Sequence, residues 1–154
     1  MSVFKYFILF LIINFSALAI GSYLMQNGPQ TNWYLTLNKA PWSPPGWVFG
    51  AAWTTIMILF SWYMAELVNS PIPSDTIIYL FVIQFVLNVI WNYVFFDKHL
   101  VLLALINIIF LTVLILYFFF NFYGDLKFKS FLIAPYAIWL LLATSLNAYI
   151  LINN

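Results

Sequence analysis

The charged residues of this chain are few, and long stretches without any charge separate them. The 154 residues include five Lys and four Asp or Glu residues, and 66% of the chain is hydrophobic. A charged side chain at the centre of a bilayer costs about 3 kcal/mol or more, so charges are expected at the ends of membrane-spanning segments. The charges fall at Lys5, Lys39, Glu66, Asp75, the Asp97-Lys98 pair, and the Asp125, Lys127 and Lys129 group.

Each of the five uncharged stretches can hold the roughly 20 apolar residues that a hydrocarbon core requires. Backbone polar groups in lipid must be satisfied within a helix or a closed barrel, and these stretches lack the alternation of barrel strands. We therefore predict an all-α integral membrane bundle in which residues 1–154 form one domain. The predicted spans lie near 5–25, 46–66, 76–96, 100–122 and 130–152, and the longest loop is 26–45.

The first span has a second interpretation. Lys5, the apolar run after it and Ala17-x-Ala19 resemble a signal peptide with a cleavage site. The run continues to Met25, however, and exceeds the ~7–15 residues of a signal core, which favours an uncleaved helix. The orientation stays open, because the Lys residues divide almost evenly between the two sides of the membrane.

The residue types argue against several functions. With no Cys and one His, a metal site made by protein ligands is not expected, and so few basic residues exclude a nucleic-acid surface. No span interior contains Lys, Asp or Glu, so a retinal-type Schiff base and a proton relay lack their side chains. His99 follows Asp97-Lys98, where a polar residue at the membrane interface is expected rather than a metal ligand.

Polar and aromatic residues recur at helical spacing inside three of the spans, so each set lies on one helical face. The sets are Gln84, Asn88, Trp91 and Phe95; Pro135, Trp139, Ala143 and Asn147; and Trp53 with Gly46 and Gly50. One interpretation is a flat, aromatic-walled pocket with a few amide anchors for a small molecule. The other is helix packing, in which amides bond across helices and small residues, as in Gly46-x3-Gly50 and Ala17-x3-Gly21, let backbones approach.

The loop 26–45 contains Asn27-Gly28-Pro29 and ends in Pro41-Trp42-Ser43-Pro44-Pro45. Proline denies helix continuation and holds the residue before it extended, which predicts a rigid lid that bears Trp side chains. The alternative is an interfacial loop whose aromatic residues belong to the membrane's aromatic belt, with Pro44-Pro45-Gly46 starting the second span.

Three motifs resemble the translocator protein family, also known as tryptophan-rich sensory proteins or peripheral benzodiazepine receptors. They are Trp33-Tyr34-x2-Leu37-x-Lys39-x-Pro41-x2-Pro44-Pro45-x-Trp47-x5-Trp53-Thr54; Gln84-x2-Leu87-Asn88-x2-Trp91-x3-Phe95-Phe96; and Pro135-Tyr136-x2-Trp139-x3-Ala143-Thr144-x-Leu146-Asn147. They occur in consistent order from about residue 33 to the end of the chain.

The resemblance implies a five-helix bundle, often a homodimer, in a membrane that we expect to be a bacterial cell membrane. It implies binding of porphyrins such as protoporphyrin IX and haem, or another flat hydrophobic molecule, beneath the first loop, with no obligatory cofactor. The residues that match the family's lid are Trp33, Tyr34, Pro44 and Pro45; the pocket residues are Trp53 and Trp139, with Asn88, Trp91, Ala143 and Asn147 nearby. We add Gln84 from its spacing and Lys39 as a partner for a porphyrin propionate.

The chain departs from the family at sites that matter. Some members bind cholesterol through a motif with a basic residue after a Tyr near the carboxyl end, but none follows Tyr149 here, so sterol binding by that motif is in doubt. Asn107 stands where many members have an Asp, and Ala40 where many have a Pro. The Asn107 change removes a charge from within the membrane.

Three functions follow as hypotheses. The first is a receptor or transport-type protein that binds porphyrin in tetrapyrrole sensing, trafficking or disposal. The second is light- and oxygen-dependent porphyrin breakdown, in which the excited porphyrin supplies the reactivity and Trp53 and Trp139 are the candidate catalytic residues. The third is a structural or regulatory membrane module whose pocket is vestigial.

Overall fold

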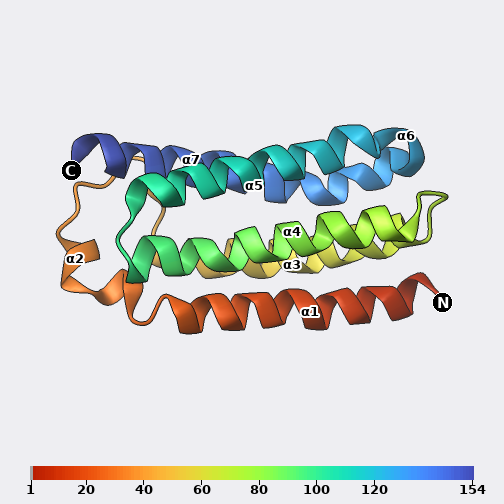
Figure 1. Cartoon of the computed structure of the whole chain (residues 1–154), viewed down its shortest axis with the longest axis horizontal. Coiled ribbons are helices and arrows are strands. Elements are labelled where there is room, and N and C mark those ends of the chain that lie inside the picture. The colour runs from red at the N-terminus through yellow and green to blue at the C-terminus, as the bar shows by residue number, and fades with distance from the viewer. Residues whose placement is uncertain (1) are drawn as a thin grey trace.

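The computed structural model describes residues 2–154 and contains five long helices. They lie side by side (Figure 1). All five are long and apolar enough to cross a membrane, which confirms the all-α fold with five spans. The long helices are α1 (Val3–Leu24), α3 (Gly46–Val68), α4 (Ser74–Asn92), α5 (Val101–Asn121) and α7 (Ala134–Asn153). The two termini lie at opposite ends of the bundle, and the loop 26–45, the lid, covers the end that holds the carboxyl terminus.

The helix ends follow local chemistry. The Ser2 side chain caps α1 by accepting a hydrogen bond from the backbone N–H of Lys5. Pro45 and Pro73 directly precede α3 and α4, where a proline blocks extension toward the amino end and costs no helical hydrogen bond. The proline run of the lid therefore does begin the second span.

Short elements connect the long helices. The lid contains η1 (Gly28–Gln30) and α2 (Asn32–Leu35), and α4 continues into a π-helical turn, η2 (Tyr93–Asp97). A short helix α6 (Tyr123–Leu126) and a 3-10 segment η3 (Lys127–Ile133) lead into α7. The last crossing is therefore a 3-10 segment followed by an α-helix, rather than one uniform helix.

The helices form a closed ring in cross-section. α1 packs against α3 and α4, α4 against α5, and α5 against α7, while α3 completes the ring mainly through η3. Toward the lid, α3 and α7 meet through side chains more than through close backbone contact. The ring is thus most tightly closed at the η3 end.

The apolar core is divided along the length of the bundle. The larger cluster fills the half near η3, where Phe60, Tyr63, Leu67, Phe118 and Ile133 are completely buried. A smaller cluster beneath the lid is built on buried Phe95, Ala104 and Ile150, with partly buried aromatic side chains around it.

Glycine positions test the packing interpretation of the small-residue motifs. A Cβ added at Gly21 would lie 2.7 Å from the amide nitrogen of the Asn92 side chain, so the small residue at this position makes room for a side chain of α4. This contact agrees with the packing interpretation of Ala17-x3-Gly21. At Gly46 and Gly50 an added Cβ would meet nothing within 4 Å. For packing within this chain the expectation that Gly46-x3-Gly50 lets two backbones approach is therefore wrong, because nothing in residues 2–154 packs against that side of α3.

Candidate ligand site beneath the lid

The lid is fastened to the corner between α4 and α5 by aromatic side chains. The indole of Trp33 stacks on His99, with ring centroids 3.9 Å apart, and meets Phe95 edge-on at 5.6 Å. Tyr34 packs against Phe96 at 5.4 Å. These contacts place Trp33 and Tyr34 at the roof of the bundle interior, as expected for lid residues.

Glycine allows the lid to lie this close. A Cβ at Gly28 would lie 2.5 Å from the Phe96 ring, closer than a real Cβ ever approaches another atom. The following Pro29 lies in the first turn of the short helix η1, and Thr31 caps α2 by accepting a hydrogen bond from the N–H of Tyr34. The lid is therefore an ordered structure with its own capped helix.

A second set of contacts holds the lid to α7. The Trp42 indole N–H donates to the Ser145 hydroxyl at 3.0 Å. The Asn154 side chain makes two hydrogen bonds with the backbone of Asn38, at 2.8 and 3.1 Å. Sequence reasoning gave no sign of either contact, because each joins residues more than one hundred positions apart.

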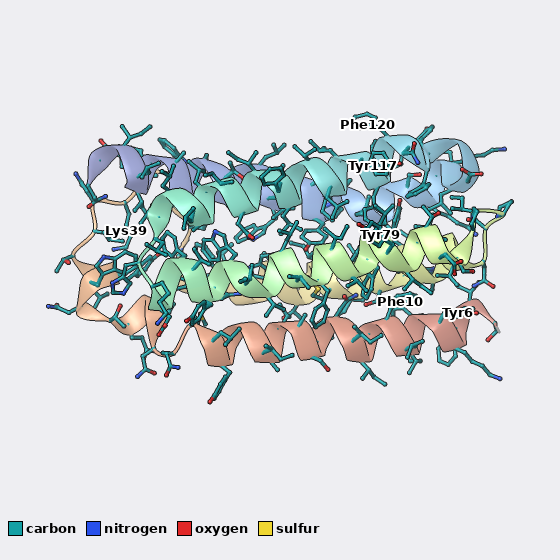
Figure 2. The ribbon with its side chains drawn as sticks, in the orientation of Figure 1. Tyr6, Phe10, Lys39, Tyr79, Tyr117 and Phe120 are labelled. Carbon is teal, nitrogen blue, oxygen red and sulfur yellow. The ribbon has the colours of Figure 1, made fainter. Side chains whose placement is uncertain are left out.

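Lys39 is the cation of the lid (Figure 2). Its ammonium lies 4.5 Å from the centre of the Tyr34 ring, a cation–π contact, and burial raises the pKa of the Tyr34 phenol above 10.0. Lys98, at the neighbouring corner, pairs with Asp97 at 3.2 Å. Within residues 2–154 Lys39 forms no such ion pair, so its charge is available to an anionic group.

Two hydrogen-bonded pairs join α4 to α7 across the interior. The Trp91 indole donates to the Asn147 side-chain oxygen at 3.0 Å, and the Asn147 amide donates onward to the carbonyl of Val101 at 3.1 Å. Deeper in the bundle the Gln84 amide donates to the Tyr136 hydroxyl at 2.7 Å. The spacing of Gln84 and Trp91 therefore does place both side chains toward α7. Because they bond to side chains of α7, these contacts support the interpretation in which amides bond across packed helices.

The layer between these two pairs, which we call the central layer, is made by Asn88, Trp139 and Ala143. Asn88 and Trp139 are 7% and 8% exposed, and Ala143 is partly buried. Within residues 2–154 the Asn88 side-chain amide forms no hydrogen bond, in contrast to Gln84 and Asn147. An uncommitted amide, an indole and a small side chain therefore face one layer of the interior.

Edge-on aromatic pairs close the central layer on the side of α3. Phe49 meets Trp139 with ring centroids 5.3 Å apart, and Trp53 meets Tyr136 at 5.8 Å. We call these four residues the α3–α7 seam. Aromatic side chains therefore make much of the contact between α3 and α7 at this level of the bundle.

A buried amide atom at the floor of the layer lacks a partner. Gln84 is 1% exposed, and its side-chain oxygen has no hydrogen bond within residues 2–154. A buried unsatisfied polar atom costs about 1–3 kcal/mol, and a ligand group that donates to it would recover that cost. Tyr136, which positions this amide, lies inside a recognised motif, yet sequence reasoning did not select it.

Other predicted site residues lie at the edge of the arrangement. Pro44 and Pro45 shape the descent from the lid into α3 and are not part of the interior layer. His99, expected to be a simple interfacial residue, has a structural role against Trp33 that sequence reasoning missed. Within the described residues 2–154, no cluster of three or more His, Cys, Asp or Glu side chains could hold a metal ion.

Comparison with known proteins agrees with this architecture. The family model described as the TspO/MBR family matches residues 7–152. The chain belongs to the TspO/MBR family. It is 32% identical over 129 residues to the tryptophan-rich protein TspO of Chlorobaculum tepidum, with 82% of each chain covered. It is also 32% identical over 115 residues to the tryptophan-rich sensory protein of Cereibacter sphaeroides, covering 75% of this chain and 72% of that one.

A third relative extends the comparison. Protein CrtK of Rhodobacter capsulatus is 29% identical over 124 residues, covering 75% of this chain and 74% of that one. The family match and the five spanning helices make the chain an integral membrane protein, and these bacterial relatives suggest a cell membrane.

Proposed function

We propose that this TspO/MBR protein binds porphyrins, with protoporphyrin IX as the model ligand, in the central layer beneath the lid. It would then act as a receptor or transport-type protein in tetrapyrrole sensing, trafficking or disposal. The observation that carries the proposal is the composition of that layer: Trp139 and the uncommitted Asn88 amide lie above the unpaired oxygen of Gln84.

The chemistry of a porphyrin matches these groups one by one. The macrocycle is a broad aromatic plate, and an indole that stacks on it gains about 0.5–1.5 kcal/mol beyond the buried area. The plate would replace the edge-on contacts of the α3–α7 seam by face-to-face contacts with Trp53 and Trp139. The propionates would point toward the lid, where Lys39 carries an unpaired positive charge.

The scarcity of strong axial ligands near the central layer favours a metal-free porphyrin. The one His lies against Trp33 in the lid and the chain has no Cys, so neither provides an axial ligand in the central layer. Protoporphyrin should therefore bind at least as tightly as haem, and bound haem should lack the spectral shift of axial coordination by the protein.

Quenching of tryptophan fluorescence during a protoporphyrin titration in detergent or nanodiscs tests the proposal. Saturable quenching is expected in the wild type, with weaker binding in Trp139→Phe and Trp53→Phe. Trp62→Phe is the matched control, because Trp62 lies on α3 but is 49% exposed and bonds to Glu66 at the far end of the bundle. Quenching that does not saturate, or that all three variants change equally, would contradict the proposal and favour a structural membrane module.

A further inference from the structure

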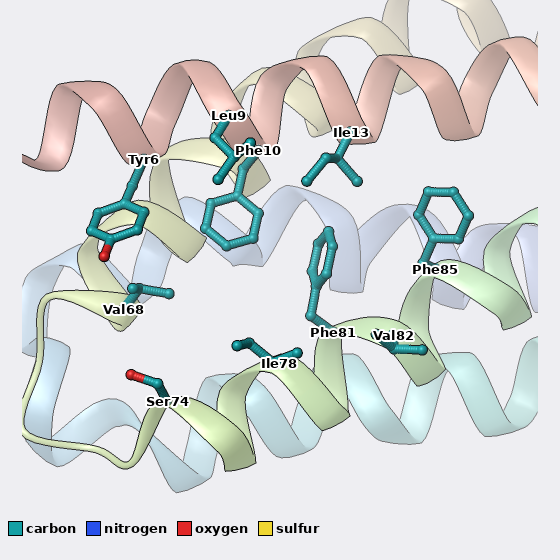
Figure 3. A pocket seen from close by; sticks show the side chains of 10 residues that line it. All are labelled: Tyr6, Leu9, Phe10, Ile13, Val68, Ser74, Ile78, Phe81, Val82 and Phe85. Carbon is teal, nitrogen blue, oxygen red and sulfur yellow. The ribbon is translucent and has the colours of Figure 1, made fainter. Parts of the chain in front are cut away.

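A hollow of about 510 Å³ lies between α1 and α4, far from the lid (Figure 3). It extends along α1 from Tyr6 to Ile13 and along α4 from Ser74 to Phe85. Its rim residues face away from the bundle interior: Ile78 is 56% exposed and Val82 52%. Since α1 and α4 are both membrane-spanning helices, the hollow opens onto the hydrocarbon of the bilayer.

The polar groups of this hollow are confined to one end. Figure 3 shows the hydroxyl groups of Tyr6 and Ser74 on the same side, and the remaining lining side chains are aliphatic or aromatic. Ser74 is the first residue of α4, and Tyr6 lies in the first turn of α1, so this end is at the membrane surface. The hollow therefore changes from polar to apolar with depth, as an amphiphilic molecule does.

Charges of both signs lie at the polar end. Lys5 precedes Tyr6 on α1, Asp75 follows Ser74 on α4, and the side chains of both charged residues are exposed. One cation on α1 and one anion on α4, both at the surface end of their helices, complement a zwitterionic headgroup, which presents a phosphate and an amine at the same depth. An anionic headgroup without an amine would leave Asp75 uncompensated.

The shape and lining of the hollow argue against the other occupants. Water needs two or more polar partners and would find none below the surface end, and an empty hollow forfeits dispersion contacts along its whole wall. A partner helix packs closely where small residues line the contact, but bulky Leu9, Ile78 and Val82 form this rim. A flexible hydrocarbon chain can fill such an irregular apolar space.

We propose that the hollow is a binding site for one zwitterionic phospholipid. One acyl chain lies between α1 and α4 along Phe10, Phe81 and Phe85, and its glycerol ester accepts hydrogen bonds from the Tyr6 and Ser74 hydroxyls. The chain covers the edge-on contact of Phe10 with Phe81, whose ring centroids are 5.0 Å apart and which joins the two helices. The lipid thereby stabilises the packing of α1 on the rest of the bundle.

Photo-crosslinking with a phosphatidylcholine that carries a diazirine on its acyl chain tests the site. In nanodiscs, labelled peptides should concentrate on residues 6–13 and 74–85 rather than on the outward face of α5. Ile78→Trp fills the hollow and should lower this labelling several-fold. Ile109→Trp is the matched control, because Ile109 is also an exposed residue of a spanning helix (α5, 44% exposed) but lies outside the hollow.

Competition between unlabelled lipids and the diazirine lipid identifies the headgroup. The pattern of labelled peptides in the wild-type protein is a test that does not depend on whether a variant folds. Unlabelled phosphatidylcholine or phosphatidylethanolamine should compete several-fold better than phosphatidylglycerol. Labelling spread evenly over every lipid-facing helix, or reduced equally by Ile78→Trp and Ile109→Trp, overturns the proposal. Crosslinks that join α1 and α4 of two protein copies overturn it as well, because a second chain then covers the hollow.

Discussion

The indole of Trp33 lies flat on the imidazole of His99, with the two rings inclined by 8° and their centroids 3.9 Å apart. Trp33 belongs to the lid, and His99 ends the turn that connects α4 to α5, so this stack joins segments that are distant in sequence. His99 holds a left-handed backbone conformation, with φ of 57°, that few residues other than Gly adopt easily. The ring of His99 therefore contacts the lid, and its backbone forms part of the turn between α4 and α5.

Replacing His99 by Gly and by Ala separates these two roles. Both variants lose the stack, worth about 0.5–1.5 kcal/mol. His99→Ala also keeps a Cβ in the left-handed conformation, and should therefore be less stable than His99→Gly by about 1 kcal/mol. Thermal unfolding in detergent measures the difference, and quenching of Trp33 by acrylamide reports the loosened lid. Equal stability of wild type, Gly and Ala variants would contradict both roles.

Replacing Asn147 by Leu should weaken the junction of α4, α5 and α7. Asn147 accepts a hydrogen bond from Trp91 and donates one to Val101, and such bonds between membrane helices are worth about 0.6–1.7 kcal/mol each. Loss of both should lower the free energy of unfolding by about 1–3 kcal/mol, measured by denaturation in mixed micelles. Asn153→Leu is the control, because the exposed Asn153 bonds only to its own helix, and an equal loss there would contradict the assignment.

The fold and the site differ in how far the sequence could predict them. The all-α fold with five spans follows from where charges are absent, because the cost of a buried charge acts at each position independently. The face shared by Gln84, Asn88 and Trp91 follows from helical period. Their partners Tyr136 and Asn147 do not, since periodicity defines a face of one helix but not how neighbouring helices are rotated about their axes.

The glycines show the same limit. Gly21 and Gly50 occur in identical small-x3-small patterns, yet Asn92 lies against Gly21 and nothing lies against Gly50. The contact of Trp33 with His99 was equally inaccessible, because it depends on the fold of the loop and on a positive φ. Local pattern therefore identifies which residues can pack closely, and only the tertiary arrangement decides which of them do.

The buried pair of Gln84 and Tyr136 should behave non-additively. Tyr136→Phe removes the hydroxyl and leaves both ends of the Gln84 amide without a partner, at a cost of about 1–3 kcal/mol. Gln84→Leu combined with Tyr136→Phe removes both polar groups and should be more stable than Tyr136→Phe alone. A double-mutant cycle of unfolding free energies measures this coupling, and simple additivity would show that the pair is not isolated from water.

Docking of the lid should weaken at high pH. Burial raises the pKa of Tyr34 above 10.0, so the docked lid retains the phenolic proton more strongly than the undocked lid. This contribution is complete below pH 10 and is lost as the pH rises through the raised pKa. Acrylamide quenching of Trp33 should therefore increase above pH 10 in the wild type and less so in Tyr34→Phe. An identical pH dependence in both proteins would contradict the assignment.

Lys39 should discriminate porphyrins by the charge at their rim. Lys39→Met keeps most of the aliphatic stem over Tyr34 but removes the only lid charge that can meet a propionate, since Lys98 is paired with Asp97. An exposed ion pair is worth up to about 1 kcal/mol, so affinity for protoporphyrin should fall about two- to fivefold. Protoporphyrin dimethyl ester, which has no charge to lose, should bind both proteins equally.

Added salt should reduce the wild-type advantage, because solvent-exposed charges are screened. Lys5→Met is the control and should change neither affinity, because Lys5 lies in the first turn of α1, and α1 begins at the end of the bundle opposite the lid. If the Lys39 variant loses affinity for acid and ester alike, Lys39 supports the lid through Tyr34 and does not contact the ligand.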